Sequence, residues 1–71
     1  MKYTINTIDK CDRFLDKFHA NDWSLWQMQY RWSDPEGFHA WFMKSGEKDI
    51  ELITFNEEIQ DRIVRYNEAP G

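Results

Sequence analysis

Cysteine, proline and glycine are scarce in this chain, and long apolar runs are missing. A single cysteine, Cys11, excludes an internal disulfide, so packing has to hold the fold together. No stretch is apolar over the roughly 20 residues that cross a bilayer, and no signal peptide is visible. We therefore expect a cytoplasmic protein that does not enter a membrane. With three glycines, two prolines and no low-complexity tract, the 71 residues are predicted to form one domain.

Catalytic and metal-binding patterns are missing as well. The two histidines, His19 and His39, have no cysteine or carboxylate at a spacing that would complete a zinc site. Cys11 falls on the apolar face of a predicted helix, with no base placed to activate it as a nucleophile. A chain this short leaves little room for a pocket that shifts the pKa of a carboxyl group. The sequence therefore predicts no enzyme, no metal and no cofactor.

Positive charge is scarce in the second half of the chain. Residues 1–35 carry five acids and five bases, whereas residues 36–71 carry eight acids and four bases, so the net charge of −4 belongs to the second half. Proteins that bind nucleic acid directly need clustered lysine and arginine for the phosphates. This distribution argues against direct nucleic-acid binding.

Aromatic residues are abundant, at 17% of the chain, and an amphipathic helix precedes most of them. Apolar residues recur at three- and four-residue steps, which is the spacing of one helix face: Ile5, Ile8, Cys11, Leu15 and Phe18. Three polar residues could cap its start: Thr4, Asn6 and Thr7. Asn21-Asp22 is expected to end it, and residues 1–5 could instead form a short extended arm.

Three stretches then alternate apolar and polar side chains with the period of a β-strand: residues 23–33, 38–44 and 49–55. The turn at residues 33–37 contains proline and glycine, which favour a tight reversal. If Trp32 pairs with Phe38, Tyr30 lies opposite Ala40. We therefore expect an antiparallel hairpin in this register.

The second turn, at residues 44–48, leaves two registers open. A two-residue turn at Gly46 places Leu52 opposite Trp41, whereas a three-residue loop places Glu51 there. A slip of one residue moves every side chain of the last strand to the other face. The register therefore decides whether the neighbour of Trp41 is apolar or charged.

A second helix is expected after Asn56, a good N-cap residue. Acids in its first turn and arginines later match the helix dipole, with two favourable i, i+4 pairs: Glu58 with Arg62 and Asp61 with Arg65. Its buried stripe is predicted to be Ile59, Ile63 and Tyr66. Residues 67–71 are expected to form a frayed tail.

These elements predict an α+β fold with the order α-β-β-β-α, in which two helices pack on one face of a three-stranded antiparallel sheet. By apolar content, the covered face should consist of Trp26, Met28, Tyr30, Trp32, Phe38 and Phe42. The open face should consist of Gln27, Gln29, Arg31, His39, Trp41 and Met43.

Two surfaces are candidate partner sites. The first is an acidic run with one base among six acids: Glu47, Asp49, Glu51, Glu57, Glu58 and Asp61. Such a run is either a solvated surface or a phosphate-like patch that docks on a basic groove of another protein. The second is the open sheet face, which is either core or an interface, including a homodimer contact: Gln27, Gln29, Arg31, Trp41 and Met43.

The α-β-β-β-α order resembles that of the double-stranded RNA-binding domains. Those domains place lysines at the start of the last helix, where this chain has Glu57 and Glu58, so the resemblance does not extend to RNA binding.

The leading helix, the two turns and the acids between Glu47 and Asp61 also resemble the layout of small acidic anti-CRISPR proteins of phages and other mobile elements. That resemblance covers most of the chain and implies inhibition of a nuclease by occupation of its nucleic-acid groove. We therefore expect a non-catalytic protein that inhibits or regulates a nucleic-acid-handling protein partner. The alternative is a homo-oligomeric structural or accessory protein.

Overall fold

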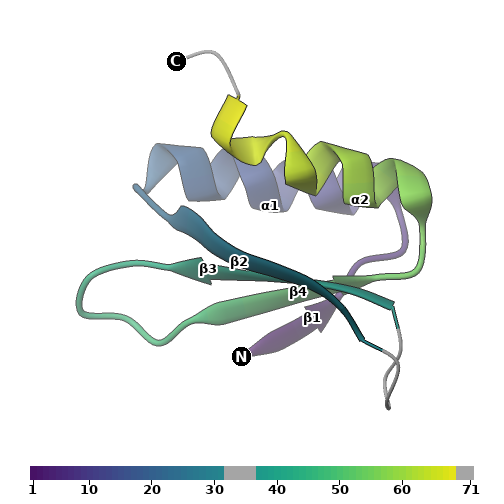
Figure 1. Cartoon of the computed structure of the whole chain (residues 1–71). Helices are drawn as coiled ribbons and strands as arrows, with labels where there is room; N and C mark the ends of the chain where they lie inside the picture. The colour runs from purple at the N-terminus through teal and green to yellow at the C-terminus, as the bar shows by residue number, and fades with distance from the viewer. Residues whose placement is uncertain (32–36, 69–71) are drawn as a thin grey trace.

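Two helices lie side by side on one face of a four-stranded sheet (Figure 1). The computed structural model describes residues 1–31 and 37–68. Its elements are β1 (Lys2–Thr4), α1 (Ile8–Ala20), β2 (Ser24–Arg31), β3 (Gly37–Met43), β4 (Ile50–Thr54), α2 (Glu57–Val64) and the 3-10 helix η1 (Tyr66–Glu68). The strands lie in the order β1-β4-β3-β2. The α+β class is as predicted.

The sheet has one strand more than predicted, and that strand makes it mixed rather than antiparallel. β1 pairs in parallel with β4, with Tyr3 beside Leu52. The amide of Ile5 extends this pairing with a hydrogen bond of 2.8 Å to the carbonyl oxygen of Ile53. Because β1 and β4 are separated by most of the chain, no local pattern specified this partner. The first residues thus form the extended arm that the alternation at Tyr3 allowed.

The first hairpin has a register two residues away from the predicted one. Tyr30 lies opposite Phe38 and Met28 opposite Ala40, so the pairing of Tyr30 with Ala40 was wrong. A shift of two residues keeps each side chain on its face, because side chains alternate with a period of two. Trp32 and the turn through Glu36 lie outside the described residues.

A β-bulge near the start of β2 changes the role of its first tryptophan. The register slips between Leu25 and Gln27, leaving Trp26 as the extra residue. Leu25 is buried in its place, whereas Trp26 is 51% exposed and its Nε1 donates a hydrogen bond of 3.0 Å to Oδ2 of Asp49. The predicted placement of Trp26 in the covered face was therefore wrong.

The second hairpin adopts the charged alternative of the two registers left open by the sequence. Trp41 lies opposite Glu51, and Phe42 lies opposite Ile50. This register places Phe42 and Leu52 on the helix side of the sheet, where both are fully buried.

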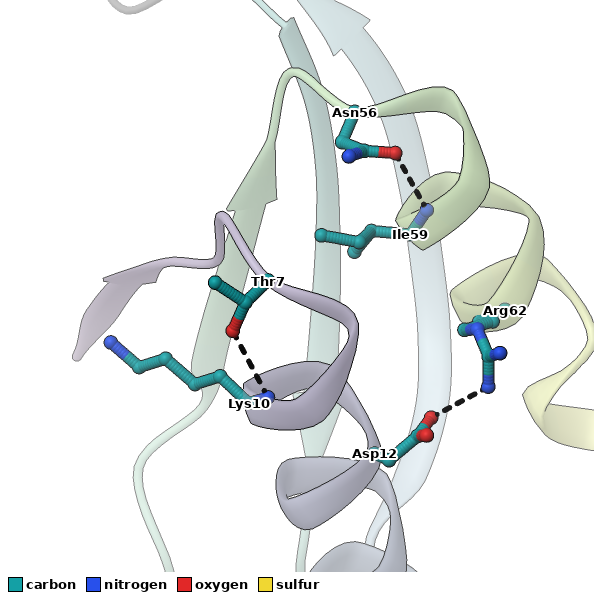
Figure 2. Close-up of polar contacts among 6 residues, drawn as sticks. All are labelled: Thr7, Lys10, Asp12, Asn56, Ile59 and Arg62. Carbon is teal, nitrogen blue, oxygen red and sulfur yellow. Dashed lines mark hydrogen bonds and ion pairs between the residues drawn. The ribbon is translucent and has the colours of Figure 1, made fainter.

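Both predicted helices are present, with α1 ending just before the predicted stop at Asn21 and α2 starting just after the predicted cap Asn56. Ile5 lies before α1 and Tyr66 lies in η1, so the helix stripes were predicted too long at these two positions. Thr7 caps α1, and its Oγ1 accepts a hydrogen bond of 3.2 Å from the amide of Lys10 (Figure 2). Asn56 caps α2, and its Oδ1 accepts from two amides, one of which, that of Ile59, is drawn in Figure 2. The apolar stripes predicted for the two helices form the core with the sheet. Of the predicted tail, Asn67 and Glu68 belong to η1, and residues 69–71 lie outside the described residues.

Phe42 lies at the centre of the core. Its ring centroid is 4.5 Å from that of Phe18 on α1 and 5.1 Å from that of Tyr66 on η1. The Tyr66 hydroxyl donates a hydrogen bond of 2.6 Å to the carbonyl oxygen of Trp23. Burial, with a contribution from the Asp22 carboxylate, raises the pKa of Tyr66, so this hydroxyl remains a donor. η1 is thereby fixed to the junction between α1 and β2.

Cys11 is expected to be chemically inert in the folded protein. It is fully buried, and burial together with the charge of Asp12 raises the pKa of its thiol from 9.0 to about 11. Because the thiolate is the reactive form, iodoacetamide at about pH 8 should leave the native protein unmodified and alkylate the urea-unfolded chain. Mass spectrometry would measure this difference. Rapid alkylation of the native protein would contradict this placement of Cys11.

The raised pKa of Cys11 also has a consequence for stability. The thiol pKa is higher in the folded state than in the unfolded chain. The resulting contribution to the free energy of unfolding is therefore fully present below pH 9 and is lost as the pH rises towards about 11. A Cys11→Ala variant should lack this part of the alkaline loss of stability, and it provides the control.

Candidate functional site

The two helices run in the same direction (Figure 1), and side-chain contacts join α1 to α2 and to η1. Nη1 of Arg62 on α2 is 2.8 Å from Oδ1 of Asp12 on α1, and Figure 2 shows this ion pair bridging the two helices. Further along α1, the ring of His19 stacks on that of Tyr66 on η1 with 4.0 Å between centroids. Arg62 was predicted to pair with Glu58 on its own helix, and the structure pairs it with the neighbouring helix instead.

An open groove of about 700 Å³ follows this junction on the outer side of the helices. The caps at Thr7 and Asn56 fix where each helix begins and hence which side chains face the groove. Five carboxylates and two guanidinium groups line it, so the groove has a clear excess of negative charge. The acidic lining residues are Asp12, Asp16, Glu58, Asp61 and Glu68, and the arginines are Arg62 and Arg65. We call this surface the interhelical groove.

Most of the carboxylates in the interhelical groove are not neutralised by an ion pair among the described residues. Within residues 1–31 and 37–68, only Asp12 among them forms an ion pair, the one with Arg62. Asp61 was expected to pair with Arg65, and no such pair forms among the described residues. Carboxylates that are not neutralised within the fold can accept hydrogen bonds from arginine and lysine side chains of a partner.

The structure divides the acidic run that the sequence presents as continuous. Glu58 and Asp61 line the interhelical groove, and Glu57 is exposed in the first turn of α2. Glu47 and Asp49 are exposed in the loop before β4, at the other end of that strand from α2. The run therefore contributes to two separate surfaces.

Glu51, the remaining member of the run, is not on either surface. It is 7% exposed, and its Oε2 shares a hydrogen bond with Nδ1 of His39, which is 0% exposed. His39 was predicted to lie on the open face and to be exposed there; it lies on that face, but it is buried. Neighbouring side chains of a strand point to opposite faces of the sheet. Ala40 and Leu52, which follow His39 and Glu51, belong to the core under the helices, so His39 and Glu51 point away from the helices. The pair is a structural element of the sheet.

The predicted open face is only partly exposed. Gln27 and Gln29 are exposed, and so is Met43. Trp41 is half-buried, with its ring 5.9 Å from that of His39 in a stacked arrangement. The backbone of Arg31 lies opposite Gly37, and its side chain lies outside the described part of the chain. Exposed residues of this face thus concentrate on β2.

Sequence reasoning missed the contribution of α1 to the interhelical groove. Asp12 and Asp16 stand four residues apart, and each directly follows a residue of the apolar stripe, Cys11 or Leu15. This spacing places both carboxylates along the edge of the face that α1 buries. The spacing was available in the sequence, but its importance depended on which helix lies alongside.

The described residues do not form a metal site, because no three or more histidine, cysteine or acidic side chains among them are grouped to hold an ion. Neither α1 nor α2 has the length and apolar composition that a membrane-crossing helix needs.

Comparison of the chain with protein-family models, with curated proteins and with solved structures gives no match in any of the three.

Proposed function

We propose that this chain is a non-catalytic binding protein that docks its interhelical groove on a basic surface of a nucleic-acid-handling protein, and thereby inhibits or regulates that protein. The observation that carries the proposal is the groove itself, in which five carboxylates from α1, α2 and η1 outnumber two arginines. Charge complementarity of this kind speeds association and selects the partner.

The groove suits a partner that normally binds phosphates. Carboxylates on two helices held side by side present a row of acceptor oxygens, which arginine and lysine side chains bind as they bind a nucleic-acid backbone. Arg62 is engaged by Asp12, so one of the two positive charges in the groove is already compensated. A partner so occupied would lose access to its nucleic acid.

A nuclease is the partner that we favour. The order of the helices and the acids between Glu47 and Asp61 in the sequence resemble those of small acidic anti-CRISPR proteins, and that resemblance implies occupation of a nuclease groove. The aromatic sheet face is a weaker candidate surface, because Trp41 is half-buried and packs against His39.

Two charge-reversal variants with the same net charge test the location of the site. Asp16→Lys with Asp61→Lys alters the groove, whereas Glu47→Lys with Glu57→Lys alters exposed acids outside it. Each tagged protein would be used to retain proteins from an extract of the source cells, followed by elution with duplex DNA and mass spectrometry.

We expect the unaltered protein and the outside variant to retain a DNA-eluted, nucleic-acid-binding partner, and the groove variant to lose it. Equal retention by both variants would contradict the assignment of the groove. Retention of no nucleic-acid-binding protein by the unaltered chain would contradict the proposed class of partner. Circular dichroism of each variant would establish that the fold is kept.

A further inference from the structure

β2 forms one edge of the sheet, and within residues 1–31 and 37–68 it pairs with no strand but β3. Its described length is 8 residues, whereas β1 at the opposite edge has 3. The outer side of an edge strand carries backbone N–H and C=O groups that the ladder leaves without partners, and these groups can pair with a strand of another chain. The two edges of this sheet therefore differ greatly in their capacity to bind.

The usual protection of an edge strand is weak along most of β2. Ser24 through Tyr30 include no charged residue and no proline. The bulge lies near the start of the strand, between Leu25 and Gln27, and beyond it the register with β3 is regular to Arg31. Natural edges are commonly blunted by charges, prolines or bulges, which twist or repel an incoming strand. In β2 such devices lie at its two ends, the bulge near its start and the charged Arg31 as its last residue.

The 3-10 helix protects only the beginning of β2. Nδ2 of Asn67 donates a hydrogen bond of 3.4 Å to the carbonyl oxygen of Leu25, and the Tyr66 hydroxyl binds that of Trp23 just before the strand. Among the described residues, no hydrogen bond of this kind reaches the backbone from Gln27 to Tyr30. This uncovered part of the strand is long enough for a ladder.

The side chains beside this edge are uncharged on both faces. On the helix side, Met28 is 44% and Tyr30 is 53% exposed, although the Tyr30 hydroxyl donates to Oε1 of Gln60. On the other side, Gln27 and Gln29 are exposed. Glutamine amides both donate and accept, so two such rows can bind each other.

From these observations we infer that β2 is a self-association edge, at which a second copy of this chain adds its own β2 in antiparallel orientation. A two-fold axis between the strands places apolar side chains against apolar ones and amides against amides, so the edge is complementary to itself. Charge also favours a second copy here. Two chains of net charge −4 repel each other at most surfaces, and most strongly at their interhelical grooves, but not along the uncharged stretch of β2 from Ser24 to Tyr30.

The dimer would be one continuous sheet of eight strands, since each copy contributes the four strands observed. Antiparallel pairing within one sheet keeps both helical layers on the same face. The two interhelical grooves would then face the same side, although the self-association does not depend on what they bind.

Three variants separate the edge from the neighbouring sheet face. Gln27→Lys with Gln29→Lys brings four lysines together across the two-fold axis, where like charges destabilise pairing. Asn6→Lys with Ser45→Lys adds the same charge at exposed positions away from β2. Met43→Lys alters the sheet face on β3 without touching the β2 edge. The assay is sedimentation equilibrium of each folded protein over a range of concentrations.

We expect a reversible dimer for the unaltered chain, for Asn6→Lys with Ser45→Lys and for Met43→Lys. The dissociation constant of Gln27→Lys with Gln29→Lys should be at least about tenfold higher. A monomer for the unaltered chain at every concentration would overturn the inference. So would an unchanged dimer in the edge variant, or a monomer in Met43→Lys, which would place the contact on the sheet face.

Discussion

Replacing Glu51 with alanine is expected to lower the free energy of unfolding by about 3 kcal/mol. The substitution removes one hydrogen-bond partner of a histidine that is fully buried, and the loss of a buried hydrogen bond leaves part of the cost of desolvation uncompensated. Urea unfolding followed by circular dichroism would measure the loss. A domain of this size has little stability in reserve, so this loss should be a large fraction of its free energy of unfolding.

Glu47→Ala is the matched control, because it makes the same change at an exposed carboxylate in the loop before β4. We expect its effect to stay within about 0.5 kcal/mol. The double variant His39→Leu with Glu51→Leu should recover part of the loss, because it leaves no polar group from this pair unmatched. Equal stability of Glu51→Ala and Glu47→Ala would show that the buried pair does not stabilise the sheet.

Truncation of Phe42 to alanine should cost about 4 kcal/mol. Its ring is fully buried between Phe18 and Tyr66, so the change opens a cavity where α1, η1 and the sheet meet. Phe55→Ala is the control, because that ring is 62% exposed and lies at the end of β4. Denaturation midpoints for the two variants would give the comparison. Similar losses for both would contradict the placement of Phe42 at the centre of the core.

The helices were predictable because their determinants are local. A threonine or asparagine cap, an apolar stripe at helical spacing and a following polar stop all lie within one segment of the chain. Asn56 caps α2 as predicted, Thr7 is the one of three candidate residues that caps α1, and the predicted stripe residues Phe18 and Ile63 are buried. No knowledge of the partner element was needed for either helix.

The sheet was only partly predictable because its determinants are not local. Alternation gave the three strands from β2 to β4, but β1 finds β4 across most of the chain. The bulge at Trp26 moves a large aromatic side chain out of the core, and Leu25 takes its place. Strict alternation contains no signal for an inserted residue.

Only part of the candidate site could be predicted, because its remaining determinants are contacts between distant segments of the chain. Glu58 and Asp61 were recognised as acids near the start of a helix, and they do line the interhelical groove. Asp12 and Asp16 join them only because α1 and α2 lie side by side. Glu51 left the acidic surface because the register of β4 placed it beside His39 in the sheet. Both outcomes depend on tertiary contacts.

The central claim is that the interhelical groove is the surface that receives a basic partner. Backbone amide shifts of the protein, recorded by nuclear magnetic resonance during titration with an oligo-arginine peptide, test it most directly. We predict salt-sensitive shifts that concentrate on the groove around Asp16 and Asp61 and that vanish in the variant with lysine at both positions. Shifts centred on the loop of Glu47 and Asp49, or spread evenly over the molecule, would contradict the claim.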